Sequence, residues 1–499
     1  MVQISVKWSG QKYPVDVDAA QTGLVLKTQL FSLTGVAPDR QKIMVKGGML
    51  KDETPLASLG LKDVRDAVGQ QLMMMGTAGE LPKAPEKPVV FMEDMTDAQI
   101  AQALKLPAGL TNLGNTCYMN ATIQCLRTVP ELLQAMELME PPRGQDQHAN
   151  LTIAMRSLFQ LLNKSGDSVP PLVFLQVLRS VFPQFAESNN HGFMQQDAEE
   201  CWGQIVHALS DRVPALTPTG EVAKEGHFVD QFMSTEVIST TTCDEVPEEP
   251  AATTIETFNK MRVNIGPGVS TYLVSEIAAS LTEKIEKNSP TLNRSSVYTK
   301  TSKISRLPQY LAINFVRFQW KPQERVKAKI LKRVQFPFEL DMTPFCTTEL
   351  QHKLAPAKQR LKEVAEKKAD EKKRKKQAPA GDVEMTPAEG SSSAAPTAAD
   401  AKKKHMAVLE EIGVEPSFLQ DPGVNPSGQY DLVAVLTHMG RAADSGHYIG
   451  WAKQEGSDNW WKYDDDKVSQ VKQEAITKLE GGGDWHTAYI CLYRAKMLE

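Results

Sequence analysis

The chain has 499 residues, of which 41% are hydrophobic and 23% are charged, and its net charge at pH 7 is -5. At roughly 150 residues per domain, this length predicts two or more folded units of ordinary globular composition. The mildly acidic charge argues against nucleic acid as a partner, because that affinity depends on clustered lysine and arginine side chains. No apolar run approaches the roughly 18 residues that would span a bilayer, so we expect no membrane partner either.

Cysteine usage indicates a reducing compartment. The six cysteines are spread along the chain and form no Cys-x-x-Cys pair. That spacing fits neither a disulfide framework nor a common zinc ribbon. The N-terminus also lacks a basic segment followed by an apolar core, which would indicate a secretory signal. We therefore expect a cytoplasmic and nuclear protein.

Residues 2 to 17 show the alternation of a β-hairpin. Apolar side chains recur at every second position from Val2 to Trp8, Ser9-Gly10 supplies a turn, and a second alternating run ends at Val17. A period of two places these side chains on one face of a sheet. The pattern predicts two antiparallel strands at the start of the chain.

A short helix is predicted next. Thr22 can cap its N-terminus, Leu26, Leu30 and Leu33 recur at helical spacing, and Gly35 can end it. Short strands then follow. The resulting order of strands and one helix indicates a small domain that ends near residue 76.

This first domain is similar to ubiquitin, most clearly in the run from Lys42 to Asp52. The resemblance implies a β-grasp fold for residues 1–76. The segment ends in Met75-Gly76-Thr77 in place of the Gly-Gly tail used for conjugation, so we expect a docking module that is not conjugated. Met44 and Met73 fall where the ubiquitin fold presents its binding patch, although both could instead belong to the core.

Two segments break the globular pattern. Residues 77–104 begin with a stretch rich in Pro, Lys, Glu and Gly, which is typical of a linker. Residues from about 351 to 427 contain a Lys/Glu run and a Ser/Ala/Pro run, and we interpret them as a disordered or partly helical insertion. The basic run between Glu371 and Lys376 could bind calmodulin or an import factor, and a solvated charged face is the alternative.

The segment from Gly109 to Asn120 carries the strongest chemical signal. Asn115 or Thr116 can cap a helix that begins at Cys117, and the positive end of the helix dipole favours a thiolate there. Asn112 lies on a glycine-containing turn and could donate its amide N–H to a tetrahedral oxyanion. A lone cysteine is usually an inert buried residue, so this interpretation requires a base elsewhere in the chain.

His447 is the candidate base. It begins an apolar strand, and a second strand ends at Asp464. If the strands form a hairpin that turns at Glu455-Gly456, His447 lies directly opposite Asp464, and the carboxylate can orient the imidazole. Asp465 is the alternative acid. Together with Cys117, this pattern predicts a thiol hydrolase.

These two segments look like the signature boxes of the ubiquitin-specific protease family, and residues 105–496 follow that family's order. The resemblance implies an α+β chain, in which the β-grasp domain precedes a papain-like cysteine protease domain with fingers, palm and thumb. It also implies that Cys117 is the nucleophile and His447 the general base and acid. Asp464 then orients the histidine, and Asn112 belongs to the oxyanion hole.

Further family landmarks imply four substrate-binding residues, which are Gln196, Asp197, Gly446 and Tyr448. An acidic residue beside the cleft would complement the basic tail of ubiquitin, although Asp197 equally suits a helix N-terminus. Many members of the family carry a zinc ribbon with two Cys-x-x-Cys pairs, and this chain has none. We therefore expect no bound metal and no cofactor.

The pairing of the two domains is similar to the proteasome-associated branch of the family. It implies that the first domain docks on the regulatory particle of the 26S proteasome through Met44 and Met73, where the enzyme trims and recycles ubiquitin from ubiquitinated proteins. Loops near residues 316–332 and 440–446 would cover the cleft of the free enzyme. The alternatives are a mainly non-catalytic, proteasome-bound ubiquitin-binding regulator and a hydrolase that acts on another Gly-Gly modifier.

Overall fold

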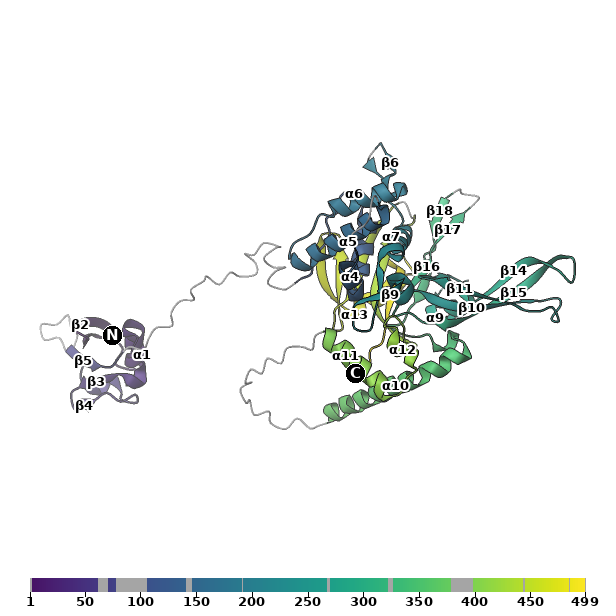
Figure 1. Cartoon of the computed structure of the whole chain (residues 1–499). Helices are drawn as coiled ribbons and strands as arrows, with labels where there is room; N and C mark the ends of the chain where they lie inside the picture. Colours follow the sequence, from purple (N-terminus) through teal and green to yellow (C-terminus); the bar gives the residue numbers. More distant parts are fainter. Residues whose placement is uncertain are drawn as a thin grey trace. The chain divides into compact units, whose positions relative to one another are not determined.

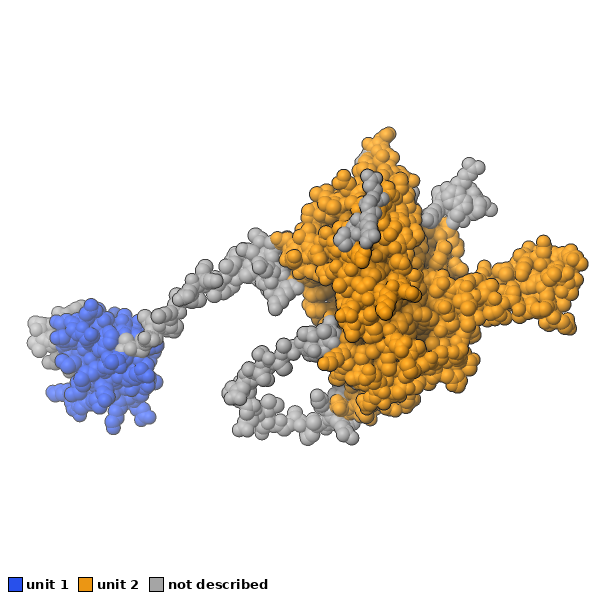
Figure 2. Space-filling view, in the orientation of Figure 1, with its two compact units in different colours: residues 1–95 blue, residues 96–499 orange. Residues whose placement is uncertain are grey.

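The structure, a computed structural model, describes residues 2–61, 71–77, 106–140, 146–190, 192–266, 270–321, 326–377, 398–442, 445–483 and 485–498. The chain divides into two compact units, residues 1–95 and residues 96–499, which Figure 2 shows in blue and orange. The linker predicted for residues 77–104 lies outside the described residues except for Thr77.

Unit 1 is built on a five-stranded sheet in the order β2-β1-β5-β3-β4. Its strands are β1 (Val2–Trp8), β2 (Gln11–Val17), β3 (Lys42–Val45), β4 (Gly48–Met49) and β5 (Gln71–Met75). β1 and β2 form the predicted antiparallel hairpin, whereas β1 and β5 pair in parallel. With one helix against the sheet, this is the β-grasp arrangement, and the fold predicted for the first domain is confirmed.

The α-helix in the described part of unit 1 is α1 (Gly23–Thr34), which begins after Thr22 as predicted. Leu26 and Leu30 are buried in the core, whereas Leu33, at the same helical spacing, is 50% exposed. Gly35 adopts a φ of 69°, a left-handed conformation that suits glycine, and its N–H donates to the Phe31 carbonyl. The helix therefore ends where the sequence predicts.

Three methionines form a row across one face of this sheet. Met44 pairs directly with Met73 on β5 and with Met49 on β4, so the three side chains lie side by side. Met44 is 47% exposed, and Met73 and Met49 are each 54% exposed. Met74, in contrast, is 2% exposed and belongs to the core. The alternative that Met44 and Met73 are core residues is therefore wrong. We call these three side chains the methionine row.

The segment that follows β5 is held against the body of unit 1. The Trp8 indole N–H donates to the Gly76 carbonyl oxygen at 2.8 Å. A Cβ atom at Gly76 would lie 2.7 Å from the Arg40 carbonyl oxygen, so the chain passes in close contact there. This segment therefore differs from a free tail, and the expectation that it is not conjugated stays a prediction.

The centre of unit 2 is an eight-stranded sheet with the path β12-β16-β25-β21-β22-β23-β24, and β20 also pairs with β21. Its strands are β12 (Met261–Asn264), β16 (Tyr310–Val316), β20 (Glu339–Asp341), β21 (Gln429–Met439), β22 (His447–Lys453), β23 (Asn459–Asp464), β24 (Lys467–Lys472) and β25 (Thr487–Ala495). The strands β16, β21 and β25 are apolar and almost wholly buried. Continuous burial of this kind is expected of strands that are covered on both faces.

Five helices pack on or near one face of this sheet, and Figure 1 shows four of them, α4 to α7, beside the yellow strands. They are α3 (Cys117–Leu126), α4 (Pro130–Glu137), α5 (Gln147–Lys164), α6 (Leu172–Val181) and α7 (Ala198–Arg212). Every residue of α3 is buried, because this helix packs between β22 and α7. At Gly450 a Cβ atom would lie only 3.2 Å from the Ala121 carbonyl oxygen. The absence of a side chain there allows α3 to approach β22 closely.

A second sheet projects from the body of unit 2, as the labels β14 and β15 in Figure 1 show. Its order is β11-β10-β15-β14, and all of its strands pair antiparallel. The strands are β10 (Thr235–Cys243), β11 (Ala252–Phe258), β14 (Thr282–Ser289) and β15 (Arg294–Arg306). Cys243 is the one cysteine within these strands, and all six cysteines of the chain are free and buried.

The described part of the predicted insertion is helical. It contains α10 (Thr348–Gln377), α11 (Ala398–Glu411) and α12 (Pro416–Gln420), and the basic run lies in α10. Leu354 and Leu409 are at most 2% exposed and belong to the core of unit 2. Lys402 on α11 also forms a 2.8 Å ion pair with the buried Glu131 of α4. Both ends of the insertion are therefore packed rather than disordered, and residues 378–397 lie outside the described residues.

Shorter elements complete unit 2, and they are β6 (Ser188–Asn189), β7 (Gly192–Phe193), β8 (Pro214–Leu216), β9 (Val222–His227), α8 (Phe228–Phe232), β13 (Ser270–Tyr272), α9 (Leu273–Ser280), β17 (Phe318–Lys321), β18 (Val326–Lys329), β19 (Arg333–Gln335) and α13 (Gln473–Thr477). Among the helices of the described residues, none is both long enough and apolar enough to cross a bilayer.

Candidate active site

Cys117 is the first residue of α3, as the sequence predicts, and it is 2% exposed. Thr116 is the N-cap residue, and its hydroxyl accepts a 2.9 Å hydrogen bond from the Leu113 N–H. Asn115 adopts a φ of 54°, so the chain turns sharply just before the helix. The thiol therefore lies at the positive end of a helix dipole.

His447 is the first residue of β22, and Asp464 is the last residue of β23. The Nε2 atom of His447 lies 2.7 Å from Oδ1 of Asp464, and Cys117 lies close enough to the same imidazole to affect its pKa. The other oxygen of Asp464 accepts from the Lys462 ammonium at 3.0 Å. The structure thus brings the three residues together as a chain of contacts from sulfur to carboxylate.

The predicted register of the β22–β23 hairpin is wrong by two residues. Gly450 pairs with Tyr463, so His447 and Asp464 are not directly opposite each other in the ladder. The reason is a longer loop, since β22 ends at Lys453 and β23 begins only at Asn459. A shift of two residues keeps each side chain on its original face of the sheet. The carboxylate therefore still reaches the imidazole, along a diagonal.

These contacts change the protonation equilibria of both groups. The hydrogen bond with Cys117 is the largest influence on His447 and, with the contribution of Asp464, raises its pKa to about 9 although burial opposes the change. Burial alone would raise the pKa of Asp464, but the hydrogen bonds from His447 and Lys462 outweigh it and lower that pKa. At neutral pH the imidazole is therefore protonated, and it lies between the sulfur and the carboxylate.

Asn112 is fixed by the turn before α3. Its Oδ1 atom accepts from the backbone N–H groups of Gly114 at 3.0 Å and Thr116 at 3.3 Å. Its Nδ2 atom donates to Oδ2 of Asp465 at 2.8 Å, and Oδ1 of Asp465 accepts from Asn120 at 2.8 Å. Asp465 is thus bonded to two asparagines, while Asp464 is bonded to the histidine. The alternative in which Asp465 orients His447 is not what the structure shows.

Gln196 and Asp197 lie just before α7. Asp197 caps this helix by accepting from the Glu199 N–H, and it also accepts from the Tyr489 hydroxyl at 2.9 Å. Asp197 therefore has the structural role expected of an acidic residue at a helix N-terminus. The Nε2 atom of Gln196 is buried and has no hydrogen-bond acceptor among the described residues. A substrate carbonyl could occupy that position, and the predicted contacts of both residues with substrate stay predictions.

Gly446 and Tyr448 flank His447 at the start of β22. Gly446 adopts a φ of 111°, and a Cβ atom there would lie 2.1 Å from the Met439 carbonyl oxygen, so only glycine fits. Tyr448 is 1% exposed, and its ring centroid lies 4.6 Å from that of His438. In this conformation Tyr448 packs in the core instead of facing solvent. Tyr448 would have to become exposed before it could make its predicted contact with substrate.

The two segments predicted to cover the cleft are joined to each other. The Lys329 N–H donates to the Arg441 carbonyl oxygen at 2.9 Å. Arg317 anchors the first segment, because its buried guanidinium donates to the carbonyls of Ala488 at 2.6 Å and Ile330 at 3.1 Å. Burial lowers the pKa of Arg317 to about 10, so it is still charged at neutral pH. Residues 322–325 and 443–444 lie outside the described residues, and closure of the cleft stays a prediction.

Two other histidines near His447 were not found by sequence reasoning. The ring of His486 lies 6.1 Å from that of His447, between centroids. Burial, followed by the charge of His447, lowers the pKa of His486 to about 4. Burial and the charge of Lys329 lower the pKa of His438 to about 3. Both rings are therefore neutral at pH 7. Their burial near His447 results from packing, which no sequence motif encodes.

The role of Asp465 was also missed, because its two asparagine partners lie far away in the sequence. The only sequence signal is its place in a run of three aspartates, from Asp464 to Asp466.

Comparison with known proteins gives matches over both units. Residues 108–493 match the family model described as Ubiquitin carboxyl-terminal hydrolase, and residues 2–75 match the one described as Ubiquitin family. The chain is 42% identical to ubiquitin carboxyl-terminal hydrolase 7 of Arabidopsis thaliana over the full length of both chains. It is 41% identical to ubiquitin carboxyl-terminal hydrolase 6 of Schizosaccharomyces pombe, with 99% of each chain covered. Its identity to ubiquitin carboxyl-terminal hydrolase 14 of Caenorhabditis elegans is 33%, over 99% of this chain and 94% of the relative.

The elevated pKa of His447 can be measured by NMR titration of isotope-labelled histidine. We expect a value of about 9 in the wild-type chain and a lower value in Cys117→Ala, because that substitution removes the largest influence on the ring. Since the folded-state pKa lies above the usual value of about 6.5, protonated His447 stabilises the fold below pH 6.5, and this contribution is lost as pH rises through 9. A value near 6.5 in both proteins would contradict the described contacts.

Proposed function

The chain belongs to the ubiquitin carboxyl-terminal hydrolase family, whose members are cysteine-protease deubiquitinases, and we propose that it cleaves the isopeptide bond after the C-terminal glycine of ubiquitin. The observation that carries this proposal is the position of His447, which is hydrogen-bonded to Asp464 and lies beside Cys117. A non-catalytic ubiquitin-binding regulator would need none of these contacts. The geometry therefore favours the enzyme over that alternative.

The proposed reaction proceeds in two steps. The Cys117 sulfur attacks the carbonyl carbon of the last glycine, and protonated His447 donates its proton to the departing lysine amine as the C–N bond breaks. His447 then takes a proton from water, which attacks the thioester and releases the ubiquitin carboxylate and free Cys117. Asp464 holds the imidazole in the orientation that both steps require.

The oxyanion formed in each step needs donors that are already in place. The Asn112 amide carries two N–H groups, and one of them is directed to Asp465. Because the amide oxygen is also fixed by two backbone N–H groups, the second N–H has a fixed direction. We assign this N–H to the oxyanion, with Asp465 as the residue that positions Asn112.

The tail of ubiquitin is assigned to the region around Gln196. Its buried Nε2 atom lacks an acceptor among the described residues, and a backbone carbonyl of an extended peptide would supply one. Asp197 contributes negative charge beside it, which complements the basic tail.

We further propose that unit 1 docks on the proteasome, where the enzyme trims ubiquitin from substrates and recycles it. The support is the methionine row, an exposed apolar strip of flexible side chains on a ubiquitin-like sheet. Docking would raise activity by displacing the joined segments at residues 316–332 and 440–446. We propose the cytoplasm and the nucleus as its location, because proteasomes work in both compartments.

The pairing of Asn112 with Asp465 can be tested with a fluorogenic ubiquitin amide. We expect Asn112→Ala and Asp465→Ala each to lower kcat by about 100-fold with little change in KM, because the lost contact acts on the oxyanion. The double variant should be no slower than either single variant, since both changes remove the same donor.

Asp466→Ala is the matched control, because Asp466 is exposed and adjacent, and it should keep wild-type kcat. Independent, multiplicative losses in the double variant would show that Asp465 does not act through Asn112.

Docking can be tested by measuring the affinity of purified proteasomes for the full chain. Met44→Glu combined with Met73→Glu should weaken binding by at least about tenfold, because it places charge in an apolar contact. Leu33→Glu is the control, since Leu33 is similarly exposed but lies on α1. Equal affinity of the methionine variant and the wild type would rule out this docking surface.

A further inference from the structure

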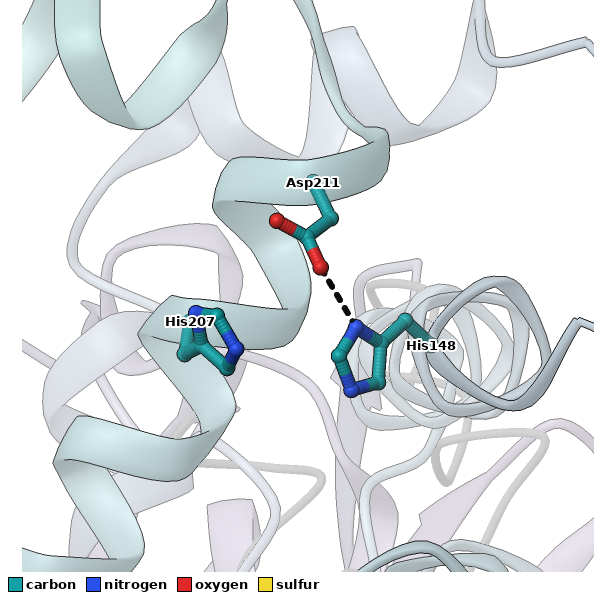
Figure 3. Close-up of side chains that lie close together, drawn as sticks. All are labelled: His148, His207 and Asp211. Atoms are coloured by element: carbon teal, nitrogen blue, oxygen red, sulfur yellow. Dashed lines mark hydrogen bonds and ion pairs between the residues drawn. The ribbon is translucent and has the colours of Figure 1, made fainter.

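We propose that His148, His207 and Asp211 form a binding site for a divalent transition-metal ion such as Zn²⁺. One ligand atom from each of these side chains lies within 4.8 Å of the other two. Figure 3 shows the three side chains close together between two helices, with the His148 and Asp211 side chains directed toward each other. Two imidazoles and one carboxylate form a donor set that suits Zn²⁺, whereas Mg²⁺ and Ca²⁺ prefer oxygen ligands alone.

The helices bring these donors together without a special loop. His207 and Asp211 are four residues apart on α7, so they lie on the same face of that helix. His148 is the second residue of α5, and α5 packs against α7. The site therefore links two helices that are already neighbours.

The spacing of the two helices at this point is fixed by other contacts. Asp146 caps α5 by accepting from the Ala149 N–H at 3.0 Å, and its second oxygen accepts from the Arg212 guanidinium at 2.8 Å. Arg212 is the last residue of α7, next to Asp211. The His148 ring also lies 5.8 Å from the ring of Phe182, between centroids. The donors are thus held close to one another before a metal ion binds.

Small side-chain rotations would complete the coordination. His148 Nδ1 lies 2.6 Å from Oδ2 of Asp211, and the centroids of the two imidazoles are 5.3 Å apart. Metal–ligand bonds of about 2.1 Å in a tetrahedral site place ligand atoms about 3.4 Å apart. The side chains of His148 and Asp211 are 24% and 40% exposed, so they have room to rotate until their ligand atoms reach that separation. A fourth position remains for water.

The position of the site indicates a structural role. It lies at the C-terminal end of α7, whereas Asp197 caps the N-terminal end, roughly 20 Å away at 1.5 Å per residue. A metal ion bound here would crosslink α5 and α7 and would not touch the reacting atoms. From the sequence, the absence of Cys-x-x-Cys pairs predicted no bound metal. The donor set proposed here was missed because His148 is far from the other two ligands along the chain.

The test uses the full-length chain with Cys117→Ala, so that the candidate nucleophile cannot bind the metal itself. Titration with Co²⁺, followed by visible absorption, should show one ion bound per chain with the intensity of a tetrahedral site. Calorimetric titration with Zn²⁺ should give the same stoichiometry, and Zn²⁺ should raise the unfolding temperature.

Adding His207→Gln or Asp211→Asn to this chain should weaken Zn²⁺ binding at least tenfold and remove the thermal shift. Both changes are nearly isosteric and lie at exposed positions, so the variants should fold. His352→Ala, which removes an exposed histidine on α10, should bind as the parent does. Absence of binding in the parent, or binding that His207→Gln and Asp211→Asn leave unchanged, would overturn the proposal, and His148 and Asp211 would then be a hydrogen-bonded pair only.

Discussion

The close packing of α3 on β22 determines the geometry of the whole site. Gly450 allows the backbone of α3 to lie against the strand, and the N-terminus of the helix then comes to the end of β22 where His447 lies. Cys117 and His447 are far apart in the sequence, and each is the first residue of its element. Their proximity therefore depends on a contact between two buried backbones, which side-chain motion alone would not disturb.

In the proposed mechanism, adjacent aspartates serve the two sides of the reaction. Asp464 is bonded to the imidazole that transfers protons, and Asp465 is bonded to the asparagine that we assign to the oxyanion. The left-handed φ of 54° at Asp465 turns the chain between them, so neighbouring carboxylates point to different partners. The neutral His438 and His486 nearby leave His447 as the charged imidazole of this region. Positive charge is thus concentrated on the imidazole that we propose as the proton donor.

Local patterns in the sequence predicted several helices and strands correctly. They could not predict contacts between residues that are far apart in the chain. The start of α3 at Cys117, the end of α1 at Gly35 and the β-grasp strands follow from capping, glycine and alternation. The hairpin register failed because loop length is not visible in the pattern of apolar residues. Buried positions such as Leu354 were hidden in a highly charged segment, whose composition suggested disorder. Contacts such as that of Asp465 with Asn112 join residues that no local pattern connects.

The proposed nucleophile, Cys117, can be identified directly. The most direct measurement is mass-spectrometric mapping of the adduct between the full chain and ubiquitin that carries a C-terminal electrophile, with and without proteasomes. We expect one adduct, on Cys117, that is lost in Cys117→Ala. It should persist in Cys125→Ala, because burial raises the pKa of Cys125, in the same helix, to about 12. An adduct that survives Cys117→Ala, or no adduct under either condition, would rule out Cys117 as the nucleophile of a deubiquitinase.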